Sequence, residues 1–536
     1  MARQESILSV ANRTAFLLFI CVSAVRIASG SLYKDAVNIE EVTSSDFYDV
    51  LTGKDHVWVI NYYKSWCGHC QRYAPIFAAF AKDIIGWSRV VRVAVIDCAV
   101  PSNLDVCRAN GVKLYPAVKF LRACATTEDK GRLWETIKTV DSVRHQTIDF
   151  LEGGNASRCT AQVSWPSLQA TNASSYTGLR GNADRALLVL ENEDSYLGRE
   201  LILDYSNSST TKVFRVLPSN MALSSELQAL GTPGEYATLY VISEPSGTPE
   251  ILSRASTAEG ARELFQAALY QEQTTTESSQ DIKTTTLRPL ADPSKVYQAD
   301  LDNALYLALT HEVPVHTTLN ETQLGALRDF VDALVDYYPG SPSVRLSLGK
   351  LRIYVWNAQP GTRGQDLSDF LGKLSIDGQG LPPLREYVGC RGSQPQYRGF
   401  PCSLWMLFHT LTVRAYEGYR EGQTKDPLDV LRSIKGFVLN YFSCRECARN
   451  FVKESRSMEE EINDPEDAVF YLWSVHNRVN ARLSGDKTED PQRPKAAFPP
   501  AFICPTCRKR GRWDQEPVLD FLLAFYGQEN LVQTTT

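Results

Sequence analysis

A Cys-Gly-His-Cys motif between a strand-like and a helix-like segment constrains this chain more than any other feature. Residues 56–60 are an apolar run typical of a buried strand, and residues 71–85 have helical spacing. At a helix N-terminus, backbone N–H groups and the helix dipole favour a thiolate, and a protonated His69 would add positive charge. We therefore expect Cys67, as the exposed member, to exchange with substrate and Cys70 to resolve the mixed disulfide. Zinc is disfavoured because no second ligand pair follows at a suitable spacing.

The apolar patterns divide the 536 residues into several domains, because the chain is too long for one hydrophobic core. Strand and helix signals alternate over about 35–155 and again over about 165–272, which predicts two α/β domains. The second of these stretches has no cysteine. Residues 272–292 are rich in Thr, Ser and Gln, as in a flexible linker, and helical spacing dominates the chain after them.

The N-terminus and the composition predict a soluble protein of the secretory lumen or the cell exterior. The net charge of −6 provides no basic field for nucleic acid. An apolar run over 16–22 and small residues over 28–30 fit a secretory signal peptide, with an uncleaved anchor as the alternative. No later run approaches the roughly 18 apolar residues that span a bilayer. Glycosylation sequons at four positions agree with this compartment: Asn155, Asn172, Asn207 and Asn320.

The cysteines pair by spacing. Loss of Cys21 with the signal peptide leaves 12 of the 13 cysteines, an even number that suits an oxidising compartment. Most of these cysteines lie in pairs of short spacing, two of which we interpret as structural disulfides: Cys98/Cys107 and Cys390/Cys402. Cys124 and Cys159 remain, and they form a further bridge only by subtraction.

Two more C-x-x-C pairs, Cys444/Cys447 and Cys504/Cys507, lie in the helical part of the chain. This spacing serves either zinc or dithiol–disulfide exchange. A shared zinc site is disfavoured because the 56 residues between Cys447 and Cys504 far exceed zinc-ribbon spacing. The Cys504/Cys507 pair is either a structural staple, which we favour, or an auxiliary redox pair.

Two predicted helices near Cys444 carry aromatic and polar side chains suited to a ring-shaped ligand. Trp405 and His409 are four residues apart and therefore share a helix face. Each of these residues taken singly is typical of an ordinary core, but the combination beside a C-x-x-C pair favours a binding site. The second helix presents four such residues along one face: Trp473, His476, Asn477 and Asn480.

The Cys67–Cys70 motif and the Tyr115-Pro116 dipeptide resemble the thioredoxin fold as it occurs in protein disulfide isomerases, over about 35–155. That resemblance implies a cis proline lying against the active disulfide. One position departs from the family, which often has a buried acid six residues before the first cysteine. This chain has Asn61 there, so proton transfer to the resolving thiol needs water or another group.

The C-terminal motifs resemble the Erv-type FAD domain, a small helical bundle that holds the flavin beside a C-x-x-C disulfide. With the thioredoxin-like part, nearly the whole chain resembles the quiescin sulfhydryl oxidase family. Phe498 stands where some relatives have Trp. The resemblance implies FAD contacts at twelve residues: Arg398, Trp405, His409, Glu446, Asn450, Trp473, His476, Asn477, Val479, Asn480, Lys495 and Phe498.

The resemblance also implies a domain order of two thioredoxin-like α/β domains, an all-α helical spacer and an Erv-type helical bundle. The spacer helices are expected to complete a pseudo-dimer within a monomeric chain. The expected divisions are a signal peptide (1–30), a redox-active thioredoxin-like domain (31–160), a redox-inactive one (161–271), a linker (272–292), a spacer (293–385), the flavin domain (386–515) and a C-terminal tail (516–536).

The implied activity is thiol oxidation that makes disulfides in reduced secretory proteins. Electrons from protein thiols, or from small thiols, would pass from Cys67/Cys70 to Cys444/Cys447, then to FAD and to oxygen, producing hydrogen peroxide. The linker between the two redox sites implies large domain motion. The alternatives are an isomerase or chaperone without oxygen chemistry, and a secreted scaffold protein with zinc-stabilised cysteine pairs.

Overall fold

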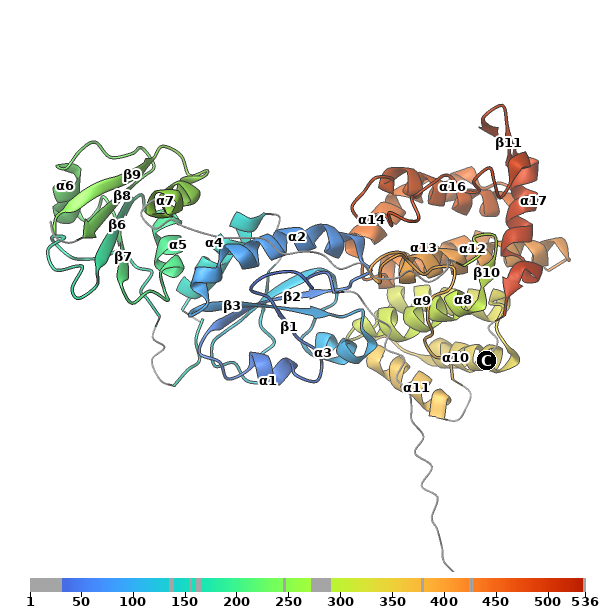
Figure 1. Ribbon diagram of the computed structural model, residues 1–536. Helices are drawn as coiled ribbons and strands as arrows, with labels where there is room; N and C mark the ends of the chain where they lie inside the picture. Colours follow the sequence, from blue (N-terminus) through green and yellow to red (C-terminus); the bar gives the residue numbers. More distant parts are fainter. Residues whose placement is uncertain are drawn as a thin grey trace, which may run out of the picture.

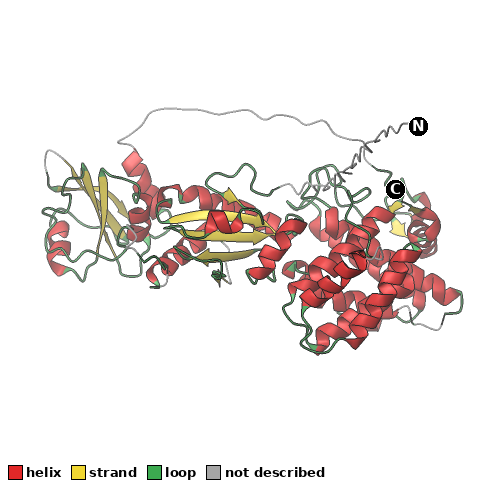
Figure 2. Cartoon of the chain, turned by 90° about the horizontal axis from the view of Figure 1, so that it is seen from below, coloured by secondary structure: helices red, strands yellow, loops and turns green. Residues whose placement is uncertain are grey.

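The computed structural model describes residues 31–134, 139–154, 156–160, 165–243, 247–270, 291–376, 380–423, 426 and 428–533. Two α/β domains and one helical domain lie in a row, with the first α/β domain between the second one and the helical domain (Figures 1 and 2). The predicted signal peptide and most of the predicted linker lie outside the described residues.

The first α/β domain is built on a five-stranded sheet of order β1-β3-β2-β4-β5. β1 and β2 run parallel to β3, whereas β4 is antiparallel to β2, and β5 to β4. Helices lie on both sides of this sheet (Figure 1), and all seven residues of β2 are buried. α2 follows β2 closely, which places the Cys-Gly-His-Cys motif at the end of the sheet. The elements are β1 Glu40–Glu41, α1 Phe47–Leu51, β2 Val57–Tyr63, α2 Gly68–Asp83, η1 Ile85–Trp87, β3 Val91–Asp97, η2 Pro101–Asn103, α3 Leu104–Ala109, β4 Ala117–Leu121, β5 Arg132–Trp134 and α4 Val140–Glu152.

The second α/β domain has a four-stranded sheet of order β7-β6-β8-β9 and no cysteine. β6 is parallel to β7 and antiparallel to β8, as expected for a thioredoxin-like core without the catalytic motif. Its elements are β6 Arg185–Glu191, α5 Leu197–Asp204, β7 Thr211–Val216, α6 Met221–Gln228, β8 Ala237–Ser243, β9 Pro249–Ala255 and α7 Ala261–Tyr270.

A buried network of ion pairs joins the two α/β domains. Arg262 of the second domain contacts Asp83 of the first at 2.7 Å and its own domain's Asp204 at 2.6 Å. Arg144 of the first domain contacts Asp83 at 2.5 Å and Glu200 of the second at 2.8 Å. Buried charges need this complete pairing because leaving one unpaired is costly. The two α/β domains therefore share a buried, charge-paired interface.

The helical domain has a single hydrophobic core that extends from Val296 to Tyr526. The predicted spacer and the predicted flavin domain therefore pack as one unit, with α9 against α13 and α8 against α12. Its elements are β10 Val296–Tyr297, α8 Gln298–Leu307, the π-helical turn η3 Ala308–Glu312, η4 Val313–Val315, α9 Glu321–Tyr337, α10 Pro342–Asn357, α11 Gly364–Ile376, α12 Gly399–Arg420, α13 Leu428–Tyr441, α14 Arg445–Glu454, α15 Met458–Glu461, α16 Pro465–Leu483, η5 Pro505–Cys507, β11 Arg508–Lys509, β12 Arg512–Trp513, α17 Gln515–Tyr526, η6 Gln528–Asn530 and β13 Leu531–Val532.

The segment expected to be a C-terminal tail is instead an integral part of this domain. α17 buries Val518, Leu522, Phe525 and Tyr526, and β13 pairs in parallel with β10 at the start of the domain. The apolar residues of 516–526 need a partner surface, which α12 provides. The division of the chain at residue 515 is therefore corrected.

Five disulfides are present in the described part of the chain: Cys98–Cys107, Cys124–Cys159, Cys390–Cys402, Cys444–Cys447 and Cys504–Cys507. Four of them match pairs of short spacing, and Cys124–Cys159 is the bridge expected by subtraction. Cys67 and Cys70 are free thiols. The residues described contain no cluster of potential metal ligands and no helix long and apolar enough to cross a membrane.

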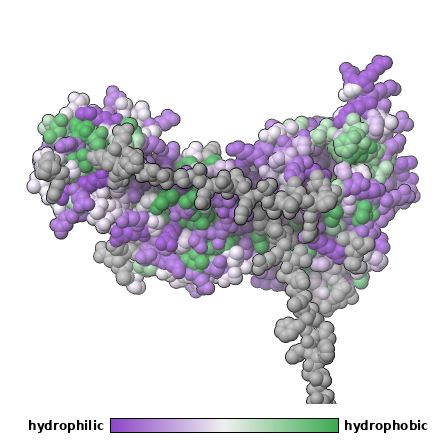
Figure 3. Space-filling model, in the orientation of Figure 1, coloured by the Kyte–Doolittle hydropathy of each residue, from purple (hydrophilic) through white to green (hydrophobic). Residues whose placement is uncertain are grey.

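The surface is mixed in character. On the face shown in Figure 3, apolar residues form separate patches among hydrophilic ones. Of the four sequons, Asn172, Asn207 and Asn320 are exposed, and Asn155 lies outside the described residues.

Candidate redox and cofactor site

The first redox site lies at the N-terminus of α2, where Cys67 is the N-cap residue and Cys70 lies in the first turn. Burial raises the pKa of Cys67, but hydrogen bonds from Cys70 and the backbone, together with the positive charge of Lys64, outweigh it and leave a lowered pKa. Burial and the neighbouring Cys67 raise the pKa of Cys70 well above its ordinary range. The thiolate is therefore favoured at Cys67 over Cys70, which agrees with the expectation that Cys67 is the attacking thiol.

Two expectations for this motif need correction. Cys67 is 0% exposed rather than exposed, because the helical domain covers the end of the sheet on which it lies. His69 carries no charge at neutral pH, because burial lowers its pKa below the ordinary histidine value.

The surroundings of Cys70 include the position where the family often has an acid. Asn61 is fully buried and donates to the hydroxyl of Tyr33 at 2.7 Å. The Lys64 backbone N–H donates to the Cys70 sulfur at 3.5 Å, which favours the thiolate once the proton has left. The Tyr115–Pro116 peptide bond is cis.

The second redox site is the Cys444–Cys447 disulfide, with Cys444 as the N-cap of α14. Cys444 is 0% exposed and belongs to the same hydrophobic cluster as Cys67 and Cys70. Trp66 stacks on Phe442 of the helical domain at 5.7 Å. The two cysteine pairs, far apart in the sequence, therefore meet at one interface.

Polar contacts surround this apolar centre. Arg72 forms ion pairs with Glu446 at 2.5 Å and with Asp486 at 3.5 Å. Gln71 donates to the backbone carbonyl of Gln396 at 2.7 Å. Glu446, which the sequence assigned to the cofactor, thus contacts the other domain here.

The predicted ring-binding residues gather between α12, α16 and α17. Trp405 stacks on His476 with ring centres 4.1 Å apart, and His409 lies 3.0 Å from His476, Nε2 to Nδ1. His409 also stacks on Tyr526, which sequence reasoning missed because residues 516–536 were expected to form a tail. Burial lowers the pKa of His409 to about 3 and that of His476 well below its ordinary value, so both rings are neutral at neutral pH.

The remaining polar residues of α16 hold the segment that carries Phe498. Trp473 donates to the Phe498 carbonyl at 2.6 Å. Asn477 bonds both the carbonyl and the N–H of Phe498, at 2.9 and 2.7 Å. Asn480 donates to the Ala496 carbonyl at 3.4 Å. Val479 and Asn450 are half-buried, and their predicted contacts with the cofactor stay predictions.

Three cations meet beside these rings: Arg398, Arg493 and Lys495. Burial, reinforced by Arg493, lowers the pKa of Arg398, and burial reinforced by Arg398 lowers the pKa of Lys495. The buried Nε atoms of Arg398 and Arg493 have no hydrogen-bond partner among the described residues. Neighbouring carboxylates partly offset this charge, and Asp490 acts on both Arg398 and Lys495. The two unpartnered Nε atoms remain available to donate to a bound anion. Arg493 was missed, although its position two residues before Lys495 was a usable signal.

Comparison with known proteins agrees with this arrangement. Residues 38–138 match the thioredoxin family model, residues 292–393 the model of FAD-dependent sulfhydryl oxidases, and residues 402–499 the Erv1 / Alr family model. Sulfhydryl oxidase 1 of Mus musculus is 33% identical, over 96% of this chain and 70% of the mouse protein. The chain belongs to the sulfhydryl oxidase family. Sulfhydryl oxidase 2 of Mus musculus is 32% identical, over 99% of this chain and 79% of its own.

A sulfhydryl oxidase fragment of human QSOX1 is a similar solved structure, 37% identical, covering 46% of this chain and 100% of its own at a TM-score of 0.43. The helices expected to be a spacer lie within residues 292–393, the stretch that matches the model of FAD-dependent sulfhydryl oxidases.

FAD is the cofactor of this sulfhydryl oxidase, and the residues present fit it. The cations Arg398, Arg493 and Lys495 would hold its diphosphate, because the buried Nε atoms of the two arginines have no hydrogen-bond partner among the described residues. Trp405 and the two neutral histidines offer flat apolar surfaces for its rings.

Proposed function

We propose that this sulfhydryl oxidase makes disulfides in reduced secretory proteins by a relay between its two cysteine pairs. A substrate dithiol reduces the Cys67–Cys70 disulfide and becomes a disulfide itself. The observation that carries the proposal is the packing of Cys67, Cys70 and Cys444 in one hydrophobic cluster, since thiol–disulfide exchange requires direct contact of sulfur atoms.

The exchange between domains follows from the acidities of the thiols. The Cys67 thiolate attacks Cys444, a mixed disulfide forms, and Cys447 leaves as a thiolate. Cys70 then loses its proton, attacks Cys67 and releases Cys444, so that two electrons have moved to the Cys444/Cys447 pair and the one proton that Cys70 held is free to protonate it. Bound FAD supplies the remaining chemistry, the passage of this electron pair to oxygen with formation of hydrogen peroxide.

The secretory location and the monomeric state are part of the same proposal. Four disulfides outside the relay pair, Cys444–Cys447, support a compartment in which disulfides persist. The packing of α8 and α9 against α12 and α13 supports a pseudo-dimer completed within one chain.

Oxygen uptake by two serine variants tests the relay. Cys447→Ser is expected to abolish oxygen consumption with every thiol, because the electron pair cannot leave the second site. Cys67→Ser is expected to lose protein-thiol oxidation and to keep oxidation of small dithiols that enter at Cys444. Equal loss of small-dithiol oxidation in both variants would contradict this division.

A further inference from the structure

A buried lysine of the first α/β domain has its polar partners in the helical domain. Lys64 follows β2, three residues before Cys67, and is 1% exposed. Its ammonium group contacts Glu312 at 2.5 Å and the hydroxyl of Ser443 at 2.9 Å. Within its own domain, the described contacts of the ammonium group are the rings of Trp66 and Tyr115.

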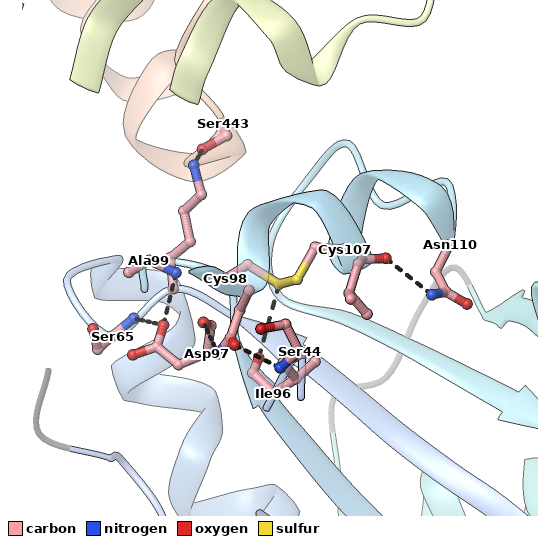
Figure 4. Close-up of a disulfide and its surroundings, with 12 residues drawn as sticks. Ser44, Ser65, Ile96, Asp97, Cys98, Ala99, Cys107, Asn110 and Ser443 are labelled. Carbon is pink, nitrogen blue, oxygen red and sulfur yellow. Dashed lines mark hydrogen bonds between the residues drawn. A yellow bond between two sulfur atoms is a disulfide. The ribbon is translucent and has the colours of Figure 1, made fainter. Parts of the chain in front are cut away.

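The carboxylate that receives this lysine is buried as well. Glu312 ends the π-helical turn η3 and is 1% exposed. Its second oxygen accepts the backbone N–H of Ser443 at 2.6 Å. Ser443 immediately precedes Cys444, and Figure 4 draws it across the interface from Asp97 and Ser65. One carboxylate therefore connects residues adjacent to both redox sites.

We propose that Lys64 and Glu312 form an ionic lock, a positioning pair that fixes the thioredoxin-like domain on the helical domain with Cys67 facing Cys444. The inference rests on the relay proposed above. It states that this ion pair determines the position in which the thioredoxin-like domain docks on the helical domain. Docking removes both the lysine and the glutamate from water, and the free-energy cost of burying each charge is offset only when the two form an ion pair. Any other register would bury one of these charges without a partner.

The other ion pairs described at this interface, those of Arg72, are not buried from water. The side chains of Arg72, Glu446 and Asp486 keep 29%, 35% and 26% of their surface exposed. Water can replace each partner of such a half-exposed pair, so its contribution is small. The buried Lys64–Glu312 pair therefore determines the docked position of the two domains.

A redox titration of the trapped mixed disulfide tests the lock. In a Cys70→Ser/Cys447→Ser background, Cys67 and Cys444 form one disulfide across the interface, and equilibration with glutathione gives the effective concentration of the two thiols. We expect Lys64→Met and Glu312→Gln each to lower this value at least about tenfold, because each leaves a buried charge unpaired on docking. Glu312 lies in the other domain, so its variant leaves the charge beside Cys67 in place.

A double variant separates the lock from a general loss of stability. Lys64→Met/Glu312→Leu removes both charges and is expected to recover most of the lost effective concentration, which additive effects would not do. The matched control is Lys119→Met, another buried lysine of the same domain whose ammonium bonds the Asn110 carbonyl; it should leave the value within about twofold. Unchanged values in both single variants, or additive losses in the double variant, would overturn the lock. Failure of the background protein to form the Cys67–Cys444 disulfide would instead overturn the relay.

Discussion

At the scale of single residues, the buried His409 makes the stability of the helical domain depend on pH. Burial lowers the pKa of His409 from the ordinary value of 6.5 to about 3, so the native state holds no proton at a site that the unfolded chain protonates. Stability therefore falls as the pH drops below about 6.5 and continues to fall towards the native pKa.

His409→Phe removes this titration and keeps a flat ring against Tyr526. Between pH 7 and pH 4.5 the unfolding free energy of the wild type should fall by about 3 kcal/mol more than that of the variant, as measured by urea unfolding. The same acid dependence in both proteins would show that His409 takes up its proton as readily in the native state as in the unfolded chain.

The Cys67 thiolate gives a second pH dependence. Because the thiolate is the attacking form, the rate of thiol exchange falls as the pH drops through the Cys67 pKa, which lies below the ordinary cysteine value. Lys64→Met removes one cause of that lowering and should move the midpoint of the rate profile to higher pH. Alkylation rates of reduced protein measured across pH check this, and an unmoved midpoint would contradict it.

At the scale of elements, α17 is the clearest difference between sequence expectation and structure. Its helical spacing is visible in the sequence, but its partner surface on α12 depends on packing between distant segments, which spacing does not reveal. Leu522 is 0% exposed, so Leu522→Ala is expected to cost about 2–5 kcal/mol of unfolding free energy. Leu439→Ala, at a leucine 58% exposed, is the matched control and should stay within about 0.5 kcal/mol. Equal effects would contradict the burial of α17.

Local sequence motifs predicted single elements and disulfides, but the sequence did not predict which residues are buried where two domains meet. Strand β2, helix α2 and four disulfides of short spacing follow from apolar runs and spacing, and the structure contains all of them. The burial of Cys67 did not follow, because it depends on the helical domain more than 200 residues away in sequence. Lys64 and Glu312 were missed for the same reason, since a lone lysine and a lone glutamate are ordinary surface residues until a fold pairs them.

At the scale of the whole molecule, the domains are joined by interfaces of different kinds. The ion network of Arg144 and Arg262 holds the two α/β domains together, with the Arg262 side chain 2% exposed. Arg262→Met leaves Asp83 and Asp204 short of a partner and is expected to cost about 3–5 kcal/mol in the unfolding of the α/β pair. Thermal unfolding checks this, and an unchanged transition would contradict a rigid pair.

The proposed relay requires the interface between the first α/β domain and the helical domain to open and close, because Cys67 is buried there and has to reach a substrate. We expect this motion to separate Trp66 from Phe442 and to carry both α/β domains together.

The measurement that tests this account most directly is the bleaching of the flavin absorbance without oxygen, after rapid mixing with a reduced protein. The relay predicts fast bleaching in the wild type and its loss in Cys67→Ser, while a small dithiol still bleaches the flavin in that variant. Bleaching by the reduced protein at the same rate in both would contradict the account, because electrons would then reach the second site without passing through Cys67.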